Sequence, residues 1–492
     1  MDVRLFAFLA RQRSAEIQPR EHFCGLPKRG LAFLLANAMF WQPLWAQAAE
    51  GVVVSGPGTS LGQAGNGVPI VNIAAPNGSG LSHNQFSDYN VGQQGLILNN
   101  ATERTQATQL GGIILGNPNL QGTAANVILN EVNGANASQL RGYTEVAGHA
   151  AKVIVANPHG ITCDGCGFIN TPQVTMSTGK PVLDGRGAVS GYQVDGGSVA
   201  LEGAGLNADN VERFDIITRS ARLNAQLRAR ELNVITGRND VDAQTLAAAP
   251  RAGNAADAPA LAIDSSALGG MYAGAIRLVG TEAGVGVRLA GDVAASGGDI
   301  RLDANGQLSL AQASASGAVK LQAAGVDLQG PVHGASQVEV RSSADLTSRQ
   351  AITAGNRISV QATGTLANQG VIEAGVNADG SRNAQGDVSI ASGQLLNSGK
   401  SIVASRDLDL AVQGQLVNRS GTLSAGQDSR ITSAALDNSA QGRVLAGRDQ
   451  TVQATQTLGN QNGLISAGQA QRVTAQTLDN RGGELSARQR NT

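Results

Sequence analysis

The sequence predicts an all-β protein, a parallel β-helix built from coils of about 20 residues. Aromatic residues make up only 3% of the chain and charged residues 15%, while glycine occurs 64 times in 492 residues. This composition suits a thin core of small aliphatic side chains more than a thick globular core. Short apolar runs alternate with polar residues, as in IRL from Ile300 and VEV from Val338, which is the period of a strand. Such segments return at a nearly constant step, separated by Gly, Asn and Ser.

The first element is a long export signal that spans residues 1–48. Two adjacent basic residues precede the apolar segment 30–41, which is too short to remain as a membrane span. Small residues at Ala46 and Ala48 then form the expected cleavage site. The basic pair lies far from the first residue, and an alternative is that an ordinary signal begins at a start codon further downstream.

Net charge and cysteine usage limit the function classes. The formal net charge is −1, and removal of the basic leader makes the mature chain more acidic. Such a chain offers no general basic field for nucleic acid, heparin or anionic lipid. Cys24 leaves with the leader, so Cys163 and Cys166 are the only cysteines of the mature protein, in an oxidising compartment.

The mature chain divides into a first part without a clear sequence repeat and a second part with a regular one. Residues from 49 to about 240 lack a clean repeat and hold the distinctive motifs. The Ala/Pro-rich stretch 242–262 is predicted to be a long loop or insertion between coils. From 263 to 492 the short strands recur regularly, and the chain stops inside a repeat, which indicates a truncated solenoid.

Asparagine marks each repeat of the periodic part. A repeat carries Leu, one residue, Asn, a short gap that contains Gly, and an aliphatic residue followed by Ala and often Gly, while the polar insert 376–385 enlarges one spacing. Asparagines at equivalent positions of stacked coils are expected to form a hydrogen-bonded ladder. A leucine-rich-repeat horseshoe has a similar period but needs more leucine in each repeat. The recurring asparagines are Asn368, Asn397, Asn418, Asn438, Asn460 and Asn480.

Four segments in order resemble the secretion domain of two-partner-secretion exoproteins: residues 72–100, 115–120, 156–171 and 268–288. This family includes the filamentous haemagglutinin-like adhesins and the contact-dependent growth inhibition effectors of Gram-negative bacteria. The resemblance implies a right-handed β-helix that is exported through an outer-membrane β-barrel transporter, whose periplasmic POTRA domains recognise the N-terminal module. It also implies a secretion domain over residues 49–290 and filamentous haemagglutinin-type repeats over 291–492.

Two Asn-Pro motifs of the family map onto this chain, and both follow short apolar strands. Asn-Pro initiates turns, because Pro fixes φ and Asn bonds to its own backbone. The motifs can either contact the transporter or serve only as turns that shape the coil. The second motif has His159 where the family commonly has Asn or Tyr, so that no role is assigned to this side chain. The eight motif residues are Asn117, Pro118, Asn119, Leu120, Asn157, Pro158, His159 and Gly160.

The CxxC pair, Cys163 and Cys166, is predicted to be a short-loop disulfide that clips a tight turn between strands. A structural zinc site needs about four ligands, and only these two cysteines and His159 are near, so no metal is expected. A thioredoxin-type redox motif should open a helix, whereas Asp-Gly between the cysteines favours a turn. Two buried thiols are the remaining alternative.

The predicted function is that of a non-enzymatic exoprotein without cofactors or catalytic residues. A polysaccharide lyase would need clustered carboxylates, but Asp and Glu are scattered, and His83 and His149 are expected to be structural or solvent-facing. The expected partners are the Sec machinery, the POTRA-bearing transporter, and a receptor on host or bacterial cells, with no nucleic acid. The protein is expected at the cell surface or released. Adhesion and growth inhibition both stay open, as does a truncated remnant or a short adhesin or biofilm matrix protein without a toxin.

Overall fold

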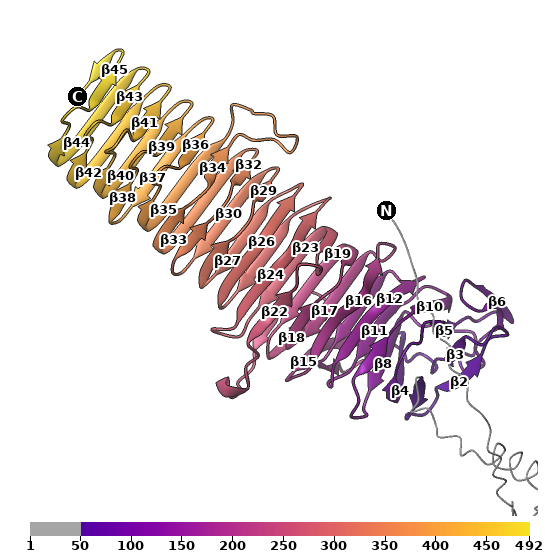
Figure 1. Cartoon of the computed structure of the whole chain (residues 1–492). Helices are drawn as coiled ribbons and strands as arrows, with labels where there is room; N and C mark the ends of the chain where they lie inside the picture. The colour runs from indigo at the N-terminus through magenta and orange to yellow at the C-terminus, as the bar shows by residue number, and fades with distance from the viewer. Residues whose placement is uncertain (1–50) are drawn as a thin grey trace, which may run out of the picture. The chain divides into compact units, whose positions relative to one another are not determined.

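The structure, a computed structural model, describes residues 51–492, and these form one β-solenoid (Figure 1). The predicted leader, with Ala46 and Ala48, lies outside the described residues. The one helical element of the described part is a single 3₁₀ turn, η1 (Ala255–Asp257). Within residues 51–492 no helix is long and apolar enough to cross a membrane.

Each coil has three faces, and each face is a parallel ladder of strands from successive coils. The first face contains β4 (Leu81–Tyr89), β8 (Val127–Val132), β11 (Lys152–Ala156), β13 (Gln173–Ser177), β17 (Arg213–Thr218), the second parts of β19 (Leu227–Thr236) and β23 (Met271–Gly280), β25 (Ile300–Ala304), β27 (Val319–Ala323), β30 (Gln337–Ser342), the first parts of β33 (Arg357–Asn368) and β35 (Asp387–Leu396), β37 (Leu408–Val412), the first parts of β40 (Ser429–Asp437), β42 (Gln450–Gly459) and β44 (Ala470–Asp479), and β46 (Arg490–Asn491).

The second face contains β9 (Ser138–Leu140), the first parts of β12 (Ile161–Ile169) and β16 (Ser198–Ala208), β18 (Ser220–Leu223), β22 (Leu261–Ser265), the first parts of β24 (Gly286–Ala295) and β26 (Gln307–Ala315), β28 (Gly325–Leu328), β31 (Leu346–Ser348), β38 (Gln415–Val417), and the second parts of β33, β35, β40, β42 and β44. The third face contains β3 (Pro69–Asn72), β5 (Leu96–Asn100), β10 (Tyr143–Gly148), the other parts of β12, β16, β19, β23, β24 and β26, β29 (Val332–Gly334), β32 (Ile352–Ala354), β34 (Val371–Ala374), β36 (Ser401–Ala404), β39 (Thr422–Ala425), β41 (Arg443–Ala446), β43 (Leu464–Ala467) and β45 (Glu484–Ala487).

The coil length and the alternating pattern confirm the predicted all-β solenoid. Gln471 bonds to Gln450 at the same position of the preceding coil, 21 residues earlier. In β25 the side chains of Ile300, Leu302 and Ala304 are buried, while the residues between them face solvent. Each such aliphatic side chain removed from water contributes about 1.5–3 kcal/mol, so the axial core is built from many small increments.

The predicted asparagine ladder is present at the corner between the second and third faces. Each asparagine donates from Nδ2 to Oδ1 of the next one, over distances of 2.7 Å from Asn368 to Asn460 and 2.6 Å at the last step, to Asn480. The residue two positions after each of the last five asparagines has a positive φ, and these residues are Gly399, Ser420, Ala440, Asn462 and Gly482. The ladder therefore holds a left-handed corner even where glycine is absent.

Insertions explain why the first half lacks a clear period. The hairpin β14 (Lys180–Leu183) and β15 (Val189–Val194) pairs with β20 (Asn239–Asp242) and β21 (Ala248–Pro250) in a separate antiparallel sheet. This accessory sheet covers outward aliphatic residues of the first face, such as Ile217. The stretch 242–262 is therefore not only a loop, because it contributes the end of β20, all of β21, η1 and the start of β22.

Antiparallel elements also cover the N-terminal end of the coil stack. The strand β1 (Val52–Val54) pairs with β4, and β2 (Ser60–Gln63) pairs with β3.

The polar insert 376–385 leaves the solenoid between β34 and β35, as expected from the sequence (Figure 1).

Candidate functional site

The first Asn-Pro motif, which begins at Asn117, is a turn whose polar groups are used inside the molecule. The Asn117 side chain is 6% exposed, and its Nδ2 donates to the carbonyl oxygens of Ile73 and Asn99 at 2.9 and 2.8 Å. Its Oδ1 accepts the backbone N–H of Asn119 at 2.9 Å, which closes an Asx turn over the intervening proline. Leu120 ends the motif inside the main core.

The second motif, which begins at Asn157, repeats this arrangement. Asn157 is fully buried, and its Nδ2 donates to the carbonyl of Asn136 at 2.9 Å and to the hydroxyl of Ser138 at 3.0 Å. Its Oδ1 accepts the backbone N–H of His159 at 2.9 Å. Gly160 has a φ of 117°, a conformation that favours glycine, and its carbonyl accepts the N–H of Ser138.

The two motifs therefore offer a partner little of their own surface. Both asparagine side chains are committed to neighbouring backbone groups. In the folded protein a partner can reach the exposed Pro118 and His159 and the half-buried Asn119 and Pro158.

A hairpin immediately before the first motif is the most exposed apolar feature of this region. The strands β6 (Thr105–Thr108) and β7 (Gly112–Leu115) form a two-stranded antiparallel sheet of their own. Ile113 and Leu115 are 78% and 73% exposed, so they point away from the coil. The sequence marks β7 as a short apolar strand, but the direction of its side chains is not visible from the pattern.

Buried groups fix this hairpin to the solenoid. Glu145 of β10 is only 4% exposed, and its two carboxylate oxygens accept the backbone N–H groups of Gln109 and Leu110 at 2.8 Å each. Ile114, between the two exposed residues, packs against Ile97 of β5. The hairpin is therefore held rigidly while one side of β7 stays open to solvent.

The cysteine pair lies within β12 and not in a turn between two strands as predicted. The first part of β12 pairs on the second face and its last part on the third face, so the pair spans a corner of the coil. The corner shows a register shift against β16, and Gly165 between the cysteines has a φ of 78°. Cys163 and Cys166 are both buried, with their Sγ atoms joined at 1.95 Å.

Leucines occupy the positions of these cysteines in the adjacent coils. Cys163 is in register with Leu140 and Leu201, and Cys166 with Leu206. The pair thus replaces an aliphatic contact with a covalent link inside the core. Oxidation of the pair in the secreted protein stays a prediction, which is tested below.

The two histidines considered as catalytic candidates lie apart. His83 Nε2 lies 2.6 Å from Glu131 Oε2, between β4 and β8. His149 is exposed in the segment that follows β10. Within residues 51–492 no group of three or more His, Cys, Asp or Glu side chains is placed to hold a metal ion.

Comparison with known protein families shows the family to which this chain belongs. The family model of the TPS secretion domain matches residues 49–310, which is more than half of the chain. The chain belongs to the two-partner-secretion exoprotein family. Haemagglutinin repeats match in four overlapping segments, namely residues 311–379, 373–420, 414–462 and 445–490.

Several relatives in this family are much longer proteins. The chain is 45% identical over 399 residues to the 16S rRNA endonuclease CdiA of Enterobacter cloacae, which covers 79% of this chain and 12% of that protein. It is 41% identical over 441 residues to the tRNA nuclease CdiA of Yersinia mollaretii, covering 85% of this chain and 15% of the relative. The chain therefore spans only a small part of these relatives.

The crystal structure of the filamentous haemagglutinin secretion domain is also similar. It is 30% identical in sequence, with a TM-score of 0.47, and the match covers 70% of this chain and 97% of that domain.

Proposed function

We propose that this chain is the N-terminal part of an exoprotein that crosses the outer membrane through a POTRA-bearing β-barrel transporter, after export by the Sec machinery. The observation that carries this proposal is the TPS secretion domain over residues 49–310. The protein then lies on the surface of a Gram-negative cell or is released from it. The coils serve as a stalk, and the chain itself carries no catalytic role.

We place the transporter-recognition surface at the β6–β7 hairpin and the adjoining Asn117 turn. The hairpin is a two-stranded sheet with free edges, and such an edge can pair with a strand of another protein. Ile113 and Leu115 add apolar contact area beside that edge. Because Glu145 of β10 and Ile97 of β5 hold the hairpin, this surface is complete once the first coils have formed and does not need the later ones.

The hairpin proposal is tested by the double substitution Ile113→Asn and Leu115→Asn. Loss of two apolar contacts of about 1.5–3 kcal/mol each predicts that the secreted fraction falls at least tenfold when the transporter is co-expressed. The matched control is Leu268→Asn, because Leu268 is 76% exposed but lies on a distant loop. Equal secretion of the double variant and of the wild type would refute this placement.

Outside the cell, the stalk serves either adhesion to a host or bacterial surface or contact-dependent inhibition of neighbouring bacteria. The relatives named as CdiA nucleases support the inhibition role, and the haemagglutinin repeats support the adhesion role. A short adhesin or biofilm matrix protein, or a truncated remnant of a longer gene, is the alternative. Extension of the reading frame into a toxin domain, found by sequencing the locus, would decide for inhibition.

A further inference from the structure

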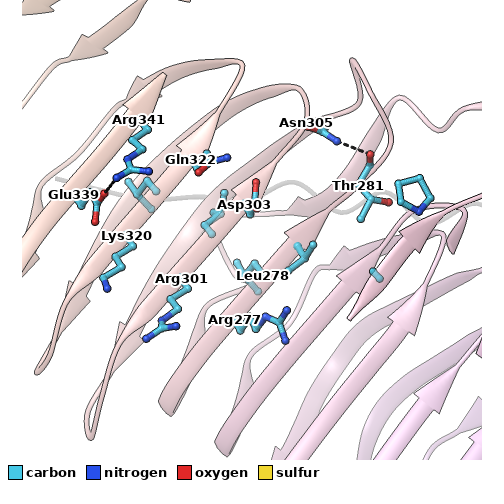
Figure 2. A pocket seen from close by; sticks show the side chains of 15 residues that line it. Arg277, Leu278, Thr281, Arg301, Asp303, Asn305, Lys320, Gln322, Glu339 and Arg341 are labelled. Carbon is cyan, nitrogen blue, oxygen red and sulfur yellow. Dashed lines mark hydrogen bonds and ion pairs between the residues drawn. The ribbon is translucent and has the colours of Figure 1, made fainter. Parts of the chain in front are cut away.

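A row of cations crosses the first face just beyond the accessory sheet. Arg277 of β23, Arg301 of β25 and Lys320 of β27 are in direct register, so they stack on successive strands about 4.8 Å apart (Figure 2). Like charges at directly opposed positions of a sheet repel one another. The formal net charge of −1 gives no sign of this local concentration.

The cation row lines a cavity of about 670 Å³, which Ala248 and Pro250 of β21 close at one side. A second cavity of about 890 Å³ follows along the same face and shares Asn305, Gln322 and Arg341 with the first. The two cavities therefore form one groove that runs along the solenoid axis from β23 to β40. The groove begins where the accessory sheet ends.

Protein carboxylates neutralise only part of this charge. Arg301 contacts Asp299 at 3.2 Å and Arg341 contacts Glu339 at 2.7 Å, both on the surface. Within residues 51–492 Lys320 makes no ion pair of its own, but its charge helps to lower the pKa of Asp299, and Glu339 follows it in register on β30. Exposed pairs of this kind are weak, so the cations stay available to an anionic ligand.

We propose that this groove binds a linear acidic polysaccharide. Guanidinium and ammonium groups at a regular spacing suit a chain of repeating carboxylates. Further along, Gln361, Thr363 and Gln413 offer amides and hydroxyls that suit sugar hydroxyls. The inference rests on the proposed export, since only an exported chain meets such a polymer, but binding is measured on purified protein and can fail independently of secretion.

Other polyanions fit the groove less well. Neither described lining set contains an aromatic side chain on which a nucleobase could stack. The strands below the groove are paired on both sides, so an acidic peptide finds no free edge. The outward apolar residues that line the two cavities, such as Val279 and Ala411, are small and separated by polar ones, so the groove has no large apolar element that inserts into a lipid surface.

The test compares the double variant Arg301→Gln and Lys320→Gln with the control Arg430→Gln and Arg472→Gln. The control residues lie in the same outward column of the same face but outside both cavities. The secreted wild-type chain should bind polygalacturonate, and the groove variant should lose affinity at least about tenfold while the control changes less than about twofold. Thermal unfolding checks that both variants are folded.

Each of the following binding results would contradict the proposal. Absence of polygalacturonate binding by the wild type, or equal losses in the groove and control variants, would overturn it. Binding of duplex DNA or phosphatidylglycerol vesicles at least as tightly, with the same dependence on Arg301 and Lys320, would assign the groove to another polyanion. Binding of neutral dextran with equal affinity would remove the role of the cations.

Discussion

At the residue scale, buried asparagine side chains make the most specific hydrogen bonds of the solenoid. In both Asn-Pro motifs and throughout the ladder, the asparagine Nδ2 donates to at least one backbone carbonyl while Oδ1 accepts a hydrogen bond from a neighbour. Nδ2 of Asn438, for example, donates to Asn460 Oδ1 and the carbonyls of Gly442 and Leu464. An asparagine is short enough to reach both its own turn and the next coil.

Replacement of Asn438 by alanine should therefore be costly. The change leaves buried partners above and below unsatisfied, and we expect the free energy of unfolding to fall by about 2–3 kcal/mol. Urea unfolding followed by circular dichroism measures this loss. The control Asn356→Ala removes an exposed asparagine outside the ladder and should change the free energy by less than about 0.5 kcal/mol. Similar losses for both variants would contradict the ladder's stabilising role.

The cysteine pair gives a second prediction at this scale. If Cys163 and Cys166 are oxidised in the secreted protein, alkylation of the urea-unfolded protein without prior reduction should modify neither cysteine, as seen by mass spectrometry; unfolding is needed because both residues are buried. The double variant Cys163→Ala and Cys166→Ala should lose about 2 kcal/mol of stability for so short a loop. Dithiothreitol should destabilise the wild type but not the variant. Alkylation of both cysteines in the unfolded, unreduced protein would show two free thiols instead.

At the scale of elements, the sequence predicts the short strands, the asparagine corners and the polar insert 376–385, but not the accessory sheet or the corner at Cys163. The spacing of Asn397 and Asn418 predicts the ladder because equivalent positions of parallel coils must stack. The accessory sheet joins segments separated by about fifty residues, and nothing local indicates that β15 pairs with β20. The corner at Cys163 was misplaced because a bulged corner and a turn share the same Asp-Gly signal.

The contact between β4 and β8 makes a pH-dependent contribution to the stability of the fold. The hydrogen bond from His83 holds the pKa of Glu131 below its ordinary value of 4.5. A lowered pKa means that this stabilisation is complete above pH 4.5 and is lost as the pH falls through the folded-state value. Glu131→Gln should therefore reduce stability by about 1 kcal/mol at pH 7, with the difference vanishing at lower pH.

Thermal unfolding between pH 3 and pH 8 measures this difference. The exposed Glu212→Gln is the matched control for loss of one carboxylate. A Glu131 variant whose deficit persists unchanged at pH 3 would show that the effect comes from packing and not from ionisation.

At the scale of the whole molecule, one continuous core links coils from β1 to β45. Each coil pairs on the exposed edge of the coil before it. Such folding outside the cell offers a way to keep the chain from sliding back through the transporter, where no nucleotide hydrolysis drives export. The composition predicts this thin core. The net charge of the chain does not predict the groove, because Arg277, Arg301 and Lys320 become neighbours only when the coils stack.

The most direct test of the central claim is a passenger experiment with the cognate transporter. One fusion carries residues 1–310 before a reporter, and the other joins residues 1–50 to 311–492 before the same reporter. Export through the TPS secretion domain predicts that the first fusion reaches the medium only when the transporter is present, while the second stays in the periplasm. Release of the first fusion without the transporter, or equal release of both, would contradict the account.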